Sequence, residues 1–276
     1  MTYMYVLAIA ILLYIFYHNR NNQTNNFVLT PSGGNDLTMI QTAMTTHDAL
    51  ELKGDFQVTG TLTPRTNNTI KINGSIKQNK PDADLFNFSN QHDVLIEGGE
   101  LIGMGKENGT TGWGIRTQGS NKQAYNITFK DLTCHDFRQS GIALNQLSRG
   151  GLVENCICNN NGQNGIGFGD VIGVTAKNNK CSGNRDSGIN FEDAWDFKAL
   201  DNNCTANGRH NLQVEHGVDG QITGGNYSEG LGDGIQIRNR ADTLERSKNI
   251  TISGVTTVNN PGGNINIIES DNIIVI

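Results

Sequence analysis

A four-residue motif recurs through the second half of the chain at nearly constant spacing. It reads Gly or Asn, then an apolar residue, any residue and another apolar residue, and it starts at Gly141, Gly165, Gly188, Asn211 and Gly234. Successive starts are therefore about 23 residues apart. A second column repeats in step with it, at Cys134, Cys158, Cys181, Cys204 and Tyr227. Such a fixed period is the signature of a solenoid, in which each repeat is one structural unit.

Apolar pairs lie between these two columns, from Ile127 and Phe129 through to Ile250 and Ile252. Each repeat therefore offers three short segments with alternating apolar residues, a pattern that neither one helix nor one long strand produces. We predict an all-β fold, a right-handed single-stranded parallel β-helix with about 23 residues per coil. Each strand pairs with its copy one coil on, about 4.8 Å away, so equivalent residues of successive repeats become neighbours.

The composition agrees with repeated tight turns. The chain has 34 glycines and only 17% charged residues. Gly and Asn are poor helix formers but tolerate positive φ in turns. Asparagines near one bend are expected to bond the backbone of adjacent coils, and these are Asn155, Asn178, Asn179, Asn202 and Asn203. The net charge of −6 gives no support for a nucleic-acid partner, which needs a basic face.

Residues 1–17 contain no charged side chain, and as a helix they span about 26 Å, enough for a thin bilayer. They predict a single-pass transmembrane or signal-anchor segment that holds the β-helix outside the cytoplasm. A cleaved signal peptide is an alternative, although a basic n-region and a small-x-small site are missing. A buried core helix is another. Residues 18–30 are interpreted as a polar linker and residues 31–276 as the β-helix domain.

The segment from Gly34 to Ala43 (GNDLTMIQTA) predicts a short helix capped by Asn35 or Asp36. Such a helix would close the apolar end of the solenoid. In this segment and in its repeats the chain resembles the pectate-lyase-like superfamily of right-handed β-helices. The resemblance covers residues 31–276 and implies the fold, but the superfamily holds lyases, hydrolases, epimerases and non-catalytic adhesion proteins.

The other end of the predicted solenoid has no evident cap. The chain ends on an apolar strand, residues 271–276. We expect either a partner, such as a second copy of the chain, or a loop such as Ala241–Asn249 to cover it.

Outward positions of the motif strand form polar columns across about four coils, or roughly 15–20 Å. That length suits a polysaccharide. The predicted substrate-binding residues are Asn190, Asp193, Trp195, His210, Gln213 and Gln236. Trp195 would stack on a sugar face. An earlier outward strand carries Arg116 shortly after Trp113.

The predicted catalytic residues are Glu192, Glu215, His216, Asp233 and Arg238. Glu215 or His216 would be the base and Glu192 or Asp233 the acid. Glu192 and Glu215, about 5 Å apart on adjacent coils, have the separation of a retaining glycosidase pair, whereas Glu192 and Asp233, roughly two coils apart, have that of an inverting pair. Arg238 would neutralise a substrate carboxylate, as a uronate lyase or epimerase requires.

Two branches of the superfamily can be compared residue by residue. Polygalacturonase-like hydrolases carry acids and a His beside these strands, and Asp233-Gly-Ile and His210-Asn-Leu match those positions. Their Asp-Asp pair and Gly-His-Gly motif are missing here, and the order of His and Asp is reversed. Alginate-epimerase-like proteins carry Asp-Pro-His on this strand, which Asn190, Phe191 and Glu192 do not reproduce. No family motif is intact.

The sequence thus predicts a membrane-anchored protein that processes an acidic glycan as a lyase, hydrolase or epimerase. The alternative is a non-catalytic glycan-binding, adhesion or structural surface protein. In that case the columns are solvated charge ladders, whose pairs contribute at most about 1 kcal/mol each. Calcium is the one cofactor that the sequence admits, on Asp170, Glu192, Asp193 and Glu215.

Overall fold

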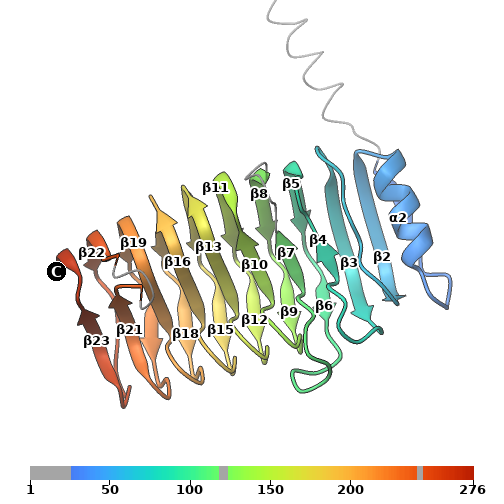
Figure 1. Cartoon of the computed structure of the whole chain (residues 1–276). Helices are drawn as coiled ribbons and strands as arrows, with labels where there is room; N and C mark the ends of the chain where they lie inside the picture. Colours follow the sequence, from blue (N-terminus) through green and yellow to red (C-terminus); the bar gives the residue numbers. More distant parts are fainter. Residues whose placement is uncertain (1–25, 118–123, 241–244) are drawn as a thin grey trace, which may run out of the picture.

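The structure is a computed structural model that describes residues 26–117, 124–240 and 245–276. It is a parallel β-helix of about 10 turns with about 23 residues per turn. Coils stack side by side from helix α2 (Leu37–Thr46) and strand β2 (Ala49–Val58) to strand β23 at the C-terminal end (Figure 1). The predicted all-β solenoid is therefore confirmed.

Three parallel faces surround the core. Face A consists of β4 (Phe86–Asn87), β7 (Ile115–Thr117), β10 (Ile142–Asn145), β13 (Ile166–Ile172), β16 (Ile189–Trp195), the first part of β19 (Leu212–Thr223), β21 (Asp233–Arg238) and β23 (Gly263–Ile268). Face B consists of β1 (Phe27–Leu29), the first parts of β2 and β3 (Thr69–Gln78), β5 (His92–Glu97), β8 (Ala124–Lys130), β11 (Leu147–Glu154), β14 (Val174–Lys177), β17 (Lys198–Leu200), the second part of β19, β22 (Lys248–Ser253) and β24 (Asp271–Val275). Face C consists of the second part of β3, β6 (Glu100–Ile102), β9 (Thr133–His135), β12 (Ile157–Asn159), β15 (Lys180–Ser182), β18 (Asn203–Thr205) and β20 (Asn226–Ser228).

Inward side chains stack in the columns that the repeat predicts. On face A, Ile166 pairs with Ile189 and Phe168 with Phe191, and all four are buried. The centroids of the two phenyl rings lie 4.8 Å apart, and the ring planes are 5° from parallel. On face C the cysteines pair in register from Cys134 to Cys204 and are buried as free thiols. Stacking thus gives each coil an apolar neighbour that it lacks alone.

Each coil turns its corners on residues in the left-handed backbone region. One coil uses Asp193, Asp196, Asp201 and Ala206, with φ between 50° and 54°. The coils before and after it place such residues at equivalent positions, which are Asp170, Gly173, Asn178, Gly183, His216, Asp219, Gly224 and Glu229. Gly, Asn and Asp adopt this conformation at little cost. Four such corners per coil explain why these residues are so frequent.

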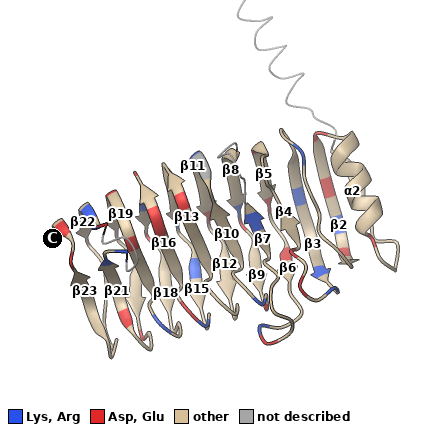
Figure 2. Ribbon diagram, in the orientation of Figure 1, with Lys and Arg blue, Asp and Glu red and all other residues tan. Residues whose placement is uncertain are grey.

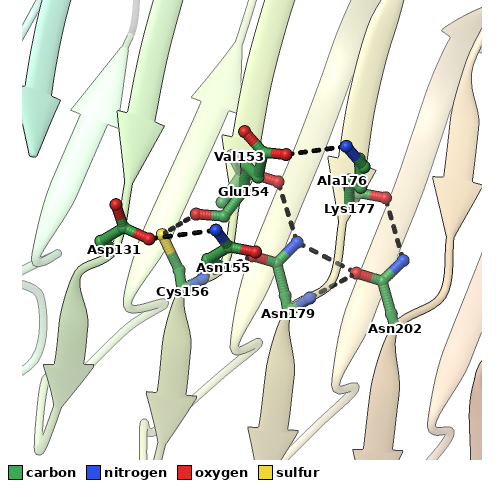
Figure 3. A network of polar contacts seen from close by, with 9 residues as sticks. All are labelled: Asp131, Val153, Glu154, Asn155, Cys156, Ala176, Lys177, Asn179 and Asn202. Carbon is green, nitrogen blue, oxygen red and sulfur yellow. Dashed lines mark hydrogen bonds and ion pairs between the residues drawn. The ribbon is translucent and has the colours of Figure 1, made fainter.

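Buried asparagines link consecutive coils through hydrogen bonds (Figure 3). The Asn202 Oδ1 accepts the backbone N–H and the side-chain amide of Asn179, both at 3.0 Å, and the Asn202 amide donates to the Ala176 carbonyl at 2.9 Å. Asn179 repeats these contacts one coil earlier, with Cys156 and Val153. The predicted bonding between coils is confirmed for these two asparagines. Asn203 is exposed.

The N-terminal part differs from the prediction in two details. Strand β1 pairs with β2, so the solenoid begins within the segment 18–30 that the sequence assigns to a linker. Helix α2 follows Asp36, but the Asp36 carboxylate bonds Ser32 and the backbone N–H of Gln57 instead of capping the helix. The predicted membrane segment, residues 1–17, lies outside the described residues. In the described part of the chain, no helix has the length and apolar character needed to cross a membrane.

At the other end, β23 and β24 form the last coil, and Ile274, Val275 and Ile276 are exposed. The loop that was expected to cover this end does not do so over residues 245–249. Ser247 is buried against the flank instead, where its hydroxyl accepts the Gly217 N–H and donates to the Arg238 carbonyl.

Candidate functional site

The outward residues of face A lie in register, as the sequence predicts. We call Arg116, Ala143, Gly167, Asn190, Gln213 and Gln236 the first column. The second column consists of Asn145, Gly169, Glu192, Glu215 and Arg238. The corner column follows at once, with Gln146, Asp170, Asp193 and His216, all at φ between 50° and 55°. Figure 2 shows negative charge on β13 and β16 and positive charge on β7.

Carboxylates of these columns are paired with arginines. The Arg238 Nη2 lies 2.6 Å from the Glu215 Oε2, and both side chains are at most one-quarter exposed. Asp193 contacts the guanidinium of Arg240, which follows β21. The predicted clamp, Arg238, therefore already has a counter-charge, and so does the predicted base Glu215.

His216 is the best-oriented acid–base group of the face, although the residue is only 8% exposed. Its Nδ1 lies 2.8 Å from the Asp193 Oδ1 and 3.4 Å from the Glu245 Oε2. Because carboxylates only accept hydrogen bonds, Nδ1 carries a proton, and in the neutral imidazole the lone pair is then on Nε2. No described residue donates to that Nε2. Trp195 packs edge to face against the imidazole, with centroids 5.4 Å apart, so its indole supports His216.

A hollow of about 340 Å³ lies beside Asp193, the residue that holds His216, although His216 itself does not line it. Its lining residues are Asn145, Gln146, Gly169, Asp170, Glu192, Asp193 and Arg240. Gly169 adds no side chain to the floor, while Glu192 and Asp170 bring carboxylates and Arg240 a guanidinium. The hollow thus offers hydrogen-bonding amides and both signs of charge to a polar ligand.

Four predicted site residues are buried and use polar atoms of their side chains to hydrogen-bond one another. Gln213 donates to Gln236 at 3.1 Å, and Gln236 donates to Asp233 at 2.8 Å. His210 lies beside them, with its Nδ1 accepting the Asp233 backbone N–H at 3.2 Å. The exposed fractions of these four residues are 3% to 8%. Asp233 as acid and His210, Gln213 and Gln236 as substrate ligands are therefore not supported by the geometry.

The predicted calcium ligands are not brought together as a set. Among the described residues, one group of three His, Cys, Asp or Glu side chains has ligand atoms within 4.8 Å of one another, and it is Asp193, His216 and Glu245. It contains a nitrogen donor, whereas calcium prefers oxygen ligands. Arg240 also neutralises Asp193 already. This donor set does not fit calcium.

Arg240 and Glu245 were missed by the sequence reasoning. Both lie at the ends of the connection between β21 and β22, in a coil that is longer than the others. Its length follows from the register, in which Ile235 of β21 pairs with Ile265 of β23. The step is shorter in the coil before it, where Leu212 pairs with Ile235. The extra residues in the longer coil were the available signal that a loop returns toward the flank.

The model of the family described as "Right handed beta helix region" matches residues 113–276, which is more than half of the chain. The chain belongs to the right-handed β-helix family. This match also confirms the predicted resemblance to pectate-lyase-like proteins. No curated protein matches this β-helix protein in sequence.

Several solved structures are similar to this β-helix protein in fold. The A-module of mannuronan C-5 epimerase AlgE6 from Azotobacter vinelandii has a TM-score of 0.72 at 17% identity, covering 87% of this chain and 73% of that chain. The enzymatically active domain of tailspike protein 2 from bacteriophage CBA120 has a TM-score of 0.72 at 14% identity, covering 88% and 40%. The periplasmic alginate epimerase AlgG has 0.62 at 12% identity, covering 82% and 60%. This chain thus spans less than half of the tailspike domain.

The buried His210 predicts a pH dependence of stability. Burial lowers the pKa of His210, outweighing the nearby Asp233 carboxylate, so the fold holds a neutral imidazole. The unfolded chain binds a proton near pH 6.5, so stability is present above that pH and is lost as the pH falls below it. We expect the unfolding free energy to fall by up to about 1.4 kcal/mol per pH unit below pH 6.5 through this group.

His210→Gln should remove this contribution to the pH dependence of the unfolding free energy. Urea unfolding of both proteins at pH 8, where His210 is neutral in both states, gives the packing difference. Urea unfolding from pH 7 to pH 5 then gives the titration difference. Equal slopes for the two proteins would contradict the assignment.

Proposed function

We propose that this β-helix protein acts on an acidic polysaccharide that lies along face A, with His216 as the group that accepts a proton. One observation carries the proposal. The imidazole is fixed by Asp193 on its Nδ1 side, its Nε2 has no donor among the described residues, and the same Asp193 lines a polar hollow. A positioned base next to a sugar-sized hollow is what proton abstraction from a uronate needs.

The reaction would begin with transfer of the C5 proton of a uronate to the His216 Nε2. The electron pair moves into the sugar carboxylate, whose growing charge Arg240 would stabilise. Elimination then breaks the C4–O bond, leaves a C4–C5 double bond and gives a proton to the departing oxygen. Alternatively, a proton returns to the opposite face of C5 and inverts it. Glu192, which lines the hollow, is the group proposed to give that proton.

The fold comparisons agree with this proposal. Two of the similar structures are titled as epimerases of mannuronan or alginate, and a third as an enzymatically active tailspike domain. At sequence identities of 12% to 17%, these similarities show the fold alone, so the argument for activity depends on the His216 site. The membrane anchor over residues 1–17 belongs to the proposal on sequence grounds only.

Glycan binding without turnover is the second candidate. It is favoured by the pairing of Arg238 with Glu215 and of Arg240 with Asp193, because a guanidinium that already has a counter-charge stabilises less of the charge growing on a substrate carboxylate, and turnover needs that stabilisation whereas binding does not.

The test is incubation of the full chain in deuterated water with pectin, alginate and glycosaminoglycans. Abstraction predicts deuterium at C5 on one of them, with an unsaturated-uronate chromophore if elimination follows. His216→Gln should lose both signals while binding is retained. New reducing ends without deuterium at C5 would assign hydrolysis and contradict the proposal. Binding with no product on any polymer would favour the second candidate.

A further inference from the structure

Arg116 stands apart from the other arginines of face A. It lies on β7 in the first column, in register with Ala143 and, through the next coils, with Gly167 and Asn190. Its guanidinium carbon lies 4.1 Å from the centroid of the Trp113 ring. Stacking on an indole fixes the plane of a guanidinium and leaves its edge donors free to point at a ligand.

The donors of Arg116 are not satisfied within the described part of the chain. Its nearest carboxylate oxygen, Asp84 Oδ2, lies 4.0 Å from Nη1, beyond hydrogen-bond range. Its Nε is buried and has no hydrogen-bond partner. Arg238 and Arg240, by contrast, each contact a carboxylate closely. The Nη groups of this partly exposed side chain are the donors that an anionic ligand could reach.

Asp84 is the nearest carboxylate to Arg116, but it does not hydrogen-bond the guanidinium. Burial raises the pKa of Asp84, which favours its neutral form, although the Trp113 N–H and Arg116 act in the opposite direction. The Asp84 Oδ1 accepts that Trp113 N–H at 3.2 Å. Asp84 thus helps to hold Trp113 in place, and the Arg116 guanidinium lies farther from its nearest carboxylate than those of Arg238 and Arg240 do.

We propose that Arg116, stacked on Trp113, is a carboxylate-binding subsite for a sugar unit remote from the reacting one, and that the ligand is a polyuronate. The inference rests on the proposed function, since it extends the same glycan along face A. Four coil steps separate β7 from β19, so Arg116 lies roughly 19 Å along the axis from His216.

The test compares ligand length and charge on the full chain. Binding of uronate hexasaccharides, of uronate disaccharides and of carboxyl-reduced hexasaccharides is measured by calorimetry. Arg116→Gln should weaken hexauronate binding about tenfold or more, because a charged, two-point hydrogen bond is lost. The disaccharide, too short to reach from His216 to Arg116, and the carboxyl-reduced hexamer should show no such change.

Arg65→Gln is the matched control, because Arg65 pairs with Asp48 on the N-terminal coils and should leave all three affinities unchanged. Arg116→Lys keeps the charge but loses the planar guanidinium that donates two parallel hydrogen bonds. Its hexauronate affinity should lie between those of the wild type and Arg116→Gln. Equal hexauronate affinity in the wild type and Arg116→Gln would overturn the subsite while leaving C5 proton exchange intact. Failure of the wild type to bind any uronate would overturn both the subsite and the proposed function.

Discussion

Asn202→Ala is expected to lower the free energy of unfolding by about 3 kcal/mol or more. The Asn202 side chain is fully buried and bonds two groups of Asn179 and the Ala176 carbonyl in the neighbouring coil. Alanine leaves the Asn179 backbone N–H without an acceptor, and each buried group so orphaned costs about 1–3 kcal/mol. The Asn179 amide keeps the Val153 carbonyl, so the loss is confined to the contact between these coils.

Asn203→Ala provides the control for this prediction. It is the same substitution one residue on, but Asn203 is exposed and begins strand β18. A surface change of this kind is expected to stay within about 0.5 kcal/mol. Urea midpoints of the two variants against the wild type measure the difference. Equal destabilisation by both would show that the buried asparagines do not hold the coils together.

The stacking of the coils could be predicted because a single number, the repeat length, determines it. Once that period is recognised, every strand is assigned a neighbour, and the pairs Glu192–Glu215 and Glu215–Arg238 follow directly. Corner residues such as Asp193 and His216 follow as well, because Asp and His tolerate positive φ better than most residues.

The chemical state of the site could not be predicted in the same way. The strand register determines which side chains are neighbours, but it does not determine which of them hydrogen-bond to each other. His210, Gln213 and Gln236 looked available to a substrate, yet neighbours across the coils bury them and use their polar atoms. Arg240, which neutralises Asp193, comes from a connection that breaks the period, so the repeat carried no information about its position.

Asp193→Asn is expected to lower kcat for C5 proton exchange by about 100-fold or more, with a smaller change in KM. The Asp193 Oδ1 accepts from the His216 Nδ1, while its Oδ2 contacts Arg240. An asparagine has one acceptor, and Arg240 can only donate, so the amide oxygen turns to Arg240 and the amide nitrogen to His216. The imidazole must then accept at Nδ1 and carry its proton on Nε2, where it can no longer act as the base.

Asp193 would act through His216, so the test needs readouts that a purely structural role would not change. Asp193→Glu retains two acceptors and should recover most of the lost kcat, whereas both variants should unfold at similar urea concentrations. Asp196→Asn is the matched control, because Asp196 is an exposed corner residue of the same coil with the same φ of 50°. If Asp193→Asn keeps the wild-type kcat on a polymer that the wild type turns over, His216 is not the base, and the proton acceptor must be sought among the other groups of the hollow, with Glu192 first.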